Sequence, residues 1–217
     1  MAEINYINTI AQLEVRIAEL GDAASAEAYA LYAEIIRCYV EIAEENQTCE
    51  WRVAAYARKC IAYGRKLVDA DCSLDVVGEV MERMLDLVTD YRPRLKSTLC
   101  EVLIEVLNKL GSEQYGEVLQ DVGEELSRLR GNIEAAERGD YGSIKQSGFL
   151  QHDPVEWSAR WEEVIDEAQR EVDERLADEP RGMGFCFSYW PALRSALQRR
   201  GVKWRTPQQM NPCVMFD

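Results

Sequence analysis

Two pairs of carboxylates at helical spacing are the first residues in this sequence that could do chemistry. Glu163 and Asp166 form an E-x-x-D pair, and Glu171 and Glu174 form an E-x-x-E pair. A separation of three residues places both members of a pair on one face of a helix, where carboxylate oxygens can bind Mg2+ or Mn2+. The pattern is therefore compatible with a metal-dependent hydrolase of a phosphorylated small molecule.

These pairs are similar to the carboxylate pairs of the all-helical nucleotide pyrophosphatases of the MazG type. In that family the E-x-x-E pair precedes the E-x-x-D pair and lies on another helix. In this chain the order is reversed, and both pairs fall within one expected helix, residues 155–177. Because an acidic helix face is usually only a solvated face, the hydrolase is the alternative interpretation and not the main one.

A second group of residues, basic and aromatic, lies near the C-terminus. The group consists of Arg194, Arg199, Arg200, Lys203 and Arg205, accompanied by Trp190 and Trp204. Guanidinium groups beside indole rings could bind an anion or an acidic peptide. The other explanation is internal, because residues 153–179 carry a formal charge of −8 and the basic segment could fold back onto them. The sequence leaves both explanations open.

The last 37 residues, 181–217, differ in composition from the rest of the chain. The runs GMGFCFSYW and WRTPQQMNPCVMFD resemble the tail of uncharacterised bacterial all-helical proteins, and this resemblance implies no activity. The segment holds three of the four phenylalanines and two of the five tryptophans. A fully solvated tail would expose these rings together, so we expect the segment to pack on the body of the protein.

Composition and charge exclude several functional classes. The net charge of −14 argues against general affinity for nucleic acids, because phosphate contacts need a positive protein surface. No apolar run reaches the roughly 18 to 20 residues of a membrane span, and the N-terminus lacks a basic signal-peptide start. We therefore expect a cytoplasmic protein, with no membrane partner and with its seven cysteines reduced.

Catalytic and cofactor motifs are absent from the sequence. His152 is the only histidine, which excludes a Cys/His zinc cluster and the H-E-x-x-H motif. Neither of the glycine-rich phosphate-binding patterns is present, and we expect no cofactor. The main functional prediction is a non-catalytic helical interaction scaffold that binds an unknown protein or anionic ligand.

Hydrophobic periodicity predicts an all-α protein, an antiparallel helical bundle of about seven or eight helices with an extended, proline-containing C-terminal tail. A stack of helical hairpins remains a second possible arrangement. The expected organisation is a helical body (1–137), a loop (138–154), and an acidic helix with the aromatic and basic segment (155–217), packed together as one domain. We expect Pro93 to end the fourth helix and Pro191 to start a short helix.

Two of the expected helices, 24–45 and 95–110, are apolar nearly all round and should be central. The predicted core residues on them are Leu31, Ile35, Leu99, Leu103 and Val106. Gly116 and Gly123 lie one heptad apart, which predicts a close approach of another backbone. In the loop, Phe149 and Leu150 are expected to hold its second half against the body.

Overall fold

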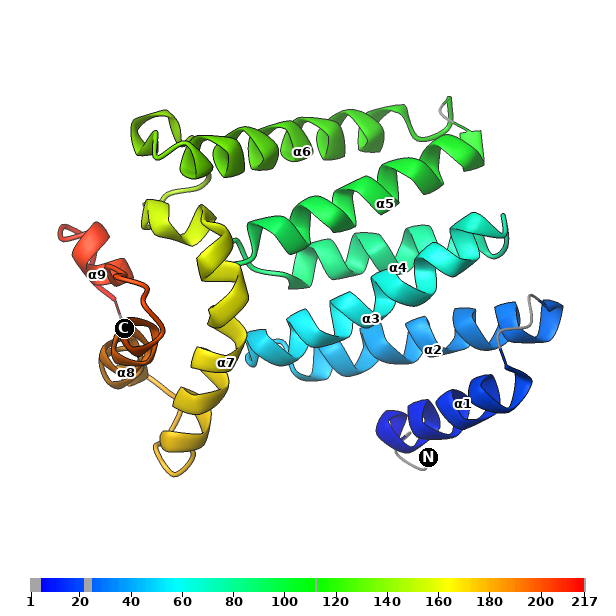
Figure 1. The fold of residues 1–217 in the computed structure, drawn as a ribbon, viewed down its shortest axis with the longest axis horizontal. Helices are drawn as coiled ribbons and strands as arrows, with labels where there is room; N and C mark the ends of the chain where they lie inside the picture. The colour runs from blue at the N-terminus through cyan, green and yellow to red at the C-terminus, as the bar shows by residue number, and fades with distance from the viewer. Residues whose placement is uncertain (1–4, 22–24, 112, 217) are drawn as a thin grey trace. The chain divides into compact units, whose positions relative to one another are not determined.

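The computed structural model describes residues 5–21, 25–111 and 113–216, and its regular structure within these ranges is entirely helical (Figure 1). The helices are α1 (Tyr6–Leu20), α2 (Ala26–Glu45), α3 (Glu50–Asp69), α4 (Leu74–Leu87), α5 (Pro93–Gly111), α6 (Gly116–Glu137), η1 (Tyr141–Ser143), η2 (Pro154–Trp157), α7 (Ala159–Arg175), α8 (Phe185–Arg199) and α9 (Pro207–Met210). This confirms the predicted all-α bundle. The predicted extended tail contains one helical turn, α9, and no strand among its described residues.

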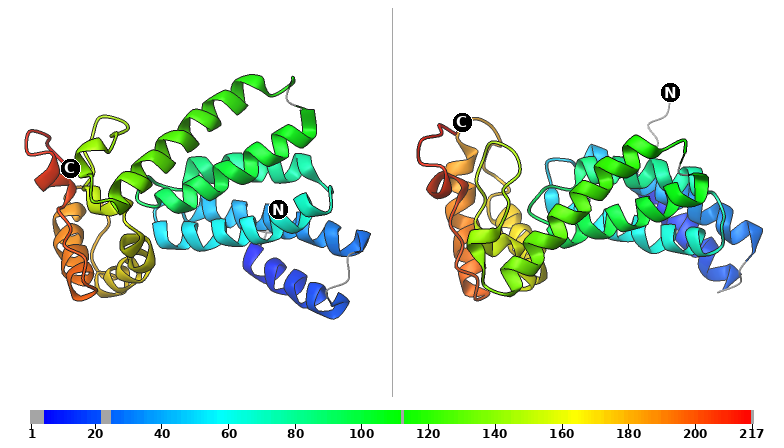
Figure 2. Two further views of the ribbon diagram at one scale, coloured as in Figure 1. Left: turned by 45° about the horizontal axis from the view of Figure 1, so that its top comes forward. Right: turned by 90° about the horizontal axis from the view of Figure 1, so that it is seen from above.

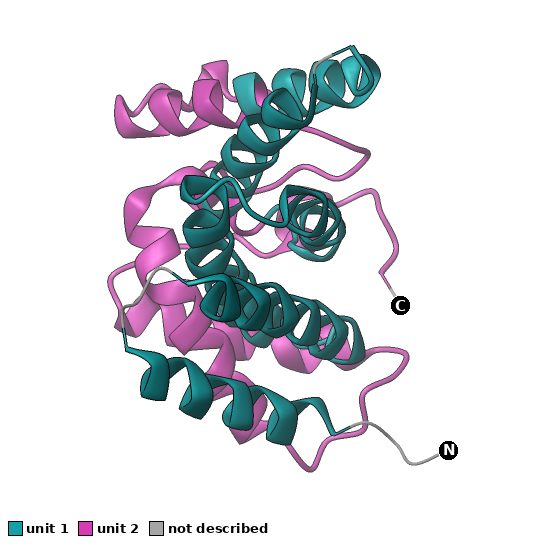
Figure 3. Ribbon diagram, turned by 90° about the vertical axis from the view of Figure 1, so that its right-hand side faces the viewer, with its two compact units in different colours: residues 1–90, 95–127 teal, residues 91–94, 128–217 magenta. Residues whose placement is uncertain are grey.

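The chain divides into two compact units, each with a hydrophobic core of its own (Figure 3). The first unit comprises residues 1–90 and 95–127, and the second comprises 91–94 and 128–217. The division falls inside α6, ten residues before the expected boundary at 137, and it assigns four residues near the start of α5 to the second unit. Whether the units form the single packed domain that the sequence suggests stays a prediction.

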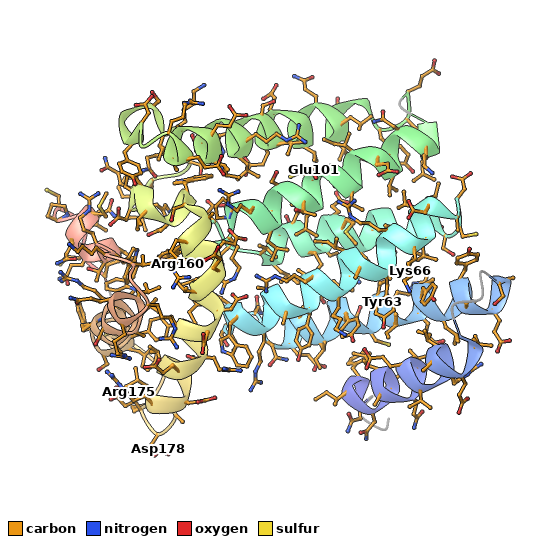
Figure 4. The ribbon with its side chains drawn as sticks, in the orientation of Figure 1. Tyr63, Lys66, Glu101, Arg160, Arg175 and Asp178 are labelled. Atoms are coloured by element: carbon orange, nitrogen blue, oxygen red, sulfur yellow. The ribbon has the colours of Figure 1, made fainter. Side chains whose placement is uncertain are left out.

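In the first unit α2 is the central helix. It packs against α1, α3 and α4, and its apolar residues cover most of its circumference, as the sequence indicates. The five predicted core residues of α2 and α5 are all buried. Side chains on α3 add an aromatic seam, because the Tyr63 ring lies 5.5 Å from that of Tyr32 and the Lys66 ammonium lies 5.0 Å from the centre of the Tyr32 ring (Figure 4).

The close approach between helices occurs at a different glycine from those that the sequence suggested. A Cβ atom added to Gly116 or Gly123 would meet no described atom within 4 Å, so the prediction for this pair is wrong. At Gly64 of α3 an added Cβ would lie 3.1 Å from Met81 Cε and 3.3 Å from Val77 Cγ1 of α4. Gly64 therefore permits the tight packing of α3 on α4, whereas the α6 glycines do not take part in such a contact.

Two proline predictions are also corrected. Pro93 does not end α4, which finishes at Leu87; it begins α5, where a proline loses only an N–H that would have no partner in the helix. Pro191 does not start a helix but lies inside α8, which begins at Phe185. Burial of the apolar face of α8 against α7 offsets the hydrogen bond that proline removes.

In the second unit α7 and α8 cross and pack against each other (Figures 1 and 2). Trp161, Ile165 and Ala168 of α7 form the core with the alanine and leucine residues of α8. The expected helix 155–177 is broken at Ser158, where η2 ends and α7 starts. The Ser158 hydroxyl donates to the carbonyl of Val155 and accepts from the amide of Trp161, so this residue serves both helices.

The loop 138–154 is held by polar contacts and not by the predicted aromatic ring. Phe149 is 87% exposed, so the expectation that its ring holds the loop is wrong, whereas Leu150 is partly buried. Instead, the Asn211 side chain accepts from the Gln151 amide and donates to the Gln151 carbonyl, each at 2.9 Å. None of the described helices has the length and apolar character needed to cross a membrane.

Candidate anion-binding surface

The chain reverses direction at the end of α8 and then runs extended over residues 202–206. Gly201 has φ of 84°, and the amide of Val202 donates to the carbonyl of Leu197, which is the glycine-dependent ending typical of α-helices. In an extended backbone, successive side chains point to opposite sides of the segment. Val202 and Trp204 are buried whereas Lys203 and Arg205 are exposed, so both basic side chains lie on the outer side of the segment.

Two carboxylates at the start of η2 hold this segment in place. Glu156 accepts a 2.6 Å hydrogen bond from the Trp204 indole, and the Trp204 ring lies 5.8 Å from that of Trp161. Asp153 accepts a 2.6 Å hydrogen bond from the backbone amide of Arg205, and the Arg205 guanidinium donates to the same carboxylate at 3.2 Å. The backbone at Lys203 is therefore fixed on both sides by buried contacts.

Three of the five predicted bases form internal ion pairs. Arg199 and Arg200 both donate to Glu171, and Arg200 also lies 3.6 Å from Glu167. The bond from Arg200 lowers the pKa of Glu171. With Arg205 bound to Asp153, the internal explanation of the basic segment therefore holds for these three residues.

Arg194 and Lys203 differ from the other bases. Both are exposed, and neither forms an ion pair or hydrogen bond with the residues that the structure describes. Trp190 makes aromatic contacts, because its ring lies 5.0 Å from that of Phe216 and 6.4 Å from that of Phe187. The predicted group of seven thus splits into an internal set, an aromatic contact and two cations that face solvent.

Two open hollows flank the extended segment. The smaller, of about 200 Å3, is lined by Arg194, Gln198, Val202, Lys203, Trp204 and Arg205. The larger, of about 600 Å3, is lined by Tyr141, Asp153, Pro154, Val155, Ser158, Arg160, Gly201, Val202, Lys203 and Arg205. We call them the small hollow and the large hollow.

The small hollow has the stronger positive character. Its lining contains three cations and no carboxylate. In the large hollow, Asp153 contributes a negative charge, and the Arg160 guanidinium, which Figure 4 labels on α7, already donates to the Arg200 carbonyl at 2.9 Å and to Glu163 at 2.9 Å. An anion would therefore find uncommitted donors mainly in the small hollow.

The predicted carboxylate pairs do not assemble into a metal site. Asp166 accepts two hydrogen bonds from the buried Arg92, Glu163 pairs with Arg160, and Glu171 pairs with Arg199 and Arg200, whereas Glu174 is exposed. Among the described residues no group of three or more histidine, cysteine, aspartate or glutamate side chains could hold a metal ion. Three of the four predicted carboxylates therefore bind guanidinium groups.

Sequence reasoning missed the buried polar residues that support the surface. Arg92 lies outside every motif, and only its contact with Asp166 and Gln169 shows its role. Asp153 and Glu156 carry a signal that could have been found, because an aspartate followed three residues later by a glutamate is a capping box. Both side chains make the reciprocal bonds of that box in η2.

Glu156 gives a testable pH dependence. It is buried, and burial raises its pKa above the ordinary value, although hydrogen bonds from His152 and Trp204 lower it in part. A carboxyl group with a higher pKa in the folded state binds more protons when folded, so the free energy of unfolding falls as pH rises through that interval. Replacing Glu156 with glutamine keeps an acceptor for Trp204 and removes the titration.

We expect thermal melts of E156Q, relative to the unsubstituted protein, to show a stability difference that grows in favour of the variant as pH rises from about 4. E174Q is the matched control, since Glu174 is an exposed carboxylate of the same unit. A stability difference between E156Q and the unsubstituted protein that stays constant across the pH range would contradict the raised pKa.

No protein-family model, curated protein sequence or solved structure matches this chain. The chemistry of the small hollow and its surroundings is therefore what indicates a function.

Proposed function

We propose that the chain is a non-catalytic binding protein whose second unit holds an anionic group of a partner in the small hollow. One observation carries this proposal: Arg194 and Lys203 face an open hollow without a carboxylate, while the neighbouring bases are bound internally. Other exposed bases of the same unit, such as Arg170 and Arg175, also lack an ion pair among the described residues, but Arg194 and Lys203 differ from them because they line one common hollow. Their placement supports an external anion as the counter-ion.

The rigidity of the segment supports the same conclusion. Buried contacts of Val202 and Trp204 fix the backbone on each side of Lys203, so the side chain begins from one position. Arg194 lies on α8, which packs on the core of the unit. Pre-positioned donors lose less conformational entropy when a ligand binds than donors on a loose tail.

The size of the positive surface favours a short acidic stretch over a nucleic acid. A nucleic acid carries phosphate charges along its whole length, and beyond the small hollow it would meet the acidic face of α7. Gln198 adds an amide donor beside the two cations, which suits a carboxylate or a single phosphate group. We therefore expect a protein partner that presents one or a few negative groups.

The proposal can be tested by fluorescence anisotropy with a labelled oligoglutamate peptide. The double variant R194Q/K203Q is expected to bind about 5- to 30-fold more weakly, since two exposed ion pairs together contribute about 1 to 2 kcal/mol. Binding by the unsubstituted protein should also weaken as salt is added.

The matched control is R170Q/R175Q. These two arginines are exposed on the same unit, form no ion pair with the described residues, and carry the same total charge. Equal loss of binding in both double variants would show that net charge alone attracts the peptide. That result, or no binding by the unsubstituted protein, would reject the small hollow as the site.

A further inference from the structure

An exposed aromatic contact lies at the start of the helix that carries Arg194. The Phe187 ring packs edge-on against Trp190, and Trp190 in turn contacts Phe216 of the C-terminal segment. Phe187 remains 48% exposed, and Trp190 and Phe216 are partly exposed. We call Phe187, Trp190 and Phe216 the apolar patch. Exposed apolar side chains gathered in this way are typical of sites where another molecule binds.

The apolar patch and the small hollow share one face of α8. Phe187, Arg194 and Gln198 are separated by seven and by four residues, and such spacings place side chains on the same side of an α-helix. All three are exposed or partly exposed. At 1.5 Å per residue, Phe187 and Arg194 lie about 10 Å apart along the helix axis. An apolar site and a cationic site are therefore adjacent and in line.

From this arrangement we infer that the partner is an acidic peptide segment with an apolar anchor residue. The inference deepens the proposed function and rests on it, because the carboxylates of the segment would occupy the small hollow. An extended peptide covers about 10 Å in three residues, so an anchor on Phe187 and Trp190 places a carboxylate three residues away beside Arg194. The charge of the hollow and the exposed rings thus specify one kind of ligand.

A membrane surface also combines apolar and negative groups, but the patch fits it less well. Recognition of anionic lipid typically uses clusters of about four to eight basic residues. Here only Arg194 and Lys203 lack an internal carboxylate among the described bases of the hollow, and the acidic helix α7 packs directly against α8. A peptide places its few charges at fixed positions, which matches two fixed cations better than a lipid surface does.

Three labelled peptides test the inference. The first carries a phenylalanine followed three residues later by two glutamates in a serine and glycine background. The second replaces the phenylalanine with serine, and the third replaces both glutamates with glutamine. The unsubstituted protein is expected to bind the first about tenfold more tightly than the second, because the anchor buries most of one aromatic side chain.

Two variants then locate the anchor. F187A should remove the preference for the first peptide over the second and leave binding of the second unchanged, whereas F187L, which keeps an apolar side chain, should retain part of the preference. Binding of the second peptide needs only the small hollow, so unchanged binding of that peptide shows that F187A is folded. F149A is the matched control, because Phe149 is an exposed phenylalanine of the same unit that takes part in no ring contact in the described structure.

The outcomes separate the two proposals. Equal affinity for the first and second peptides would overturn the apolar anchor while leaving the anion site intact. Absence of binding to both would reject the proposed function as well. Equal affinity for the first and third peptides, or binding to phosphatidylserine vesicles without binding to the first peptide, would show an apolar or lipid-binding surface and contradict the acidic peptide.

Discussion

Replacing Arg92 with leucine is expected to lower the free energy of unfolding of the second unit by about 3 to 5 kcal/mol. The Arg92 side chain is 1% exposed, and its guanidinium donates to Asp166 at 2.6 and 2.8 Å and also to Gln169. Without the guanidinium, the Asp166 carboxylate loses its buried cation, and the cost of leaving a charge unpaired there exceeds any gain from the added leucine.

Urea denaturation followed by tryptophan fluorescence measures this loss, because four of the five tryptophans belong to the second unit. The double variant R92L/D166L is the informative companion, since replacing both partners by apolar residues is often close to neutral. If R92L alone costs less than about 1 kcal/mol, the ion pair is solvated and the buried arrangement is wrong.

Replacing Leu103 with alanine is expected to lower the free energy of unfolding of the first unit by about 2 to 5 kcal/mol. Leu103 is 2% exposed in α5, among the residues of the first core. The substitution removes buried methyl groups and leaves a cavity, because close-packed neighbours relax only in part.

Far-UV circular dichroism during urea denaturation follows this unit through its helices. V15A is the control, because Val15 lies on α1 of the same unit and is more than half exposed. We expect V15A to change stability by no more than about 0.5 kcal/mol. Similar losses in L103A and V15A would place Leu103 at the surface and contradict the central position of α5.

The helices and their cores could be predicted from the sequence because they depend on patterns that are local in the chain. Leu31 and Ile35 on α2, like Leu99 and Leu103 on α5, are four residues apart among residues that are apolar nearly all round, and this pattern alone indicates burial. The break at Ser158 and the continuity of α8 through Pro191 were missed, since both depend on which face of a helix is covered. Pro191 is tolerated in α8 only because α7 packs against its apolar side.

In the candidate site, too, the sequence predicted the local pattern but not the tertiary contacts. The sequence placed Arg194, Arg200 and Lys203 in one basic group, but their spacing could not tell which of them would meet a carboxylate. That choice depends on contacts between segments about thirty residues apart, such as Arg200 with Glu171 and Arg199 with the same residue. Likewise, the spacing of Glu163 and Asp166 is typical of a metal-binding pair, but in the fold Glu163 forms an ion pair with Arg160 and Asp166 forms one with Arg92.

Composition and periodicity therefore determined that this is an acidic, all-helical chain with α2 and α5 as buried helices, because burial of apolar faces follows directly from residue order. Tertiary structure alone decided which charges are neutralised inside the protein. An ion pair forms where folding brings two side chains within about 4 Å, and no local pattern specifies that distance. The packing of α8 on α7 and the anchoring of Trp204 on Glu156 leave Arg194 and Lys203 facing the small hollow.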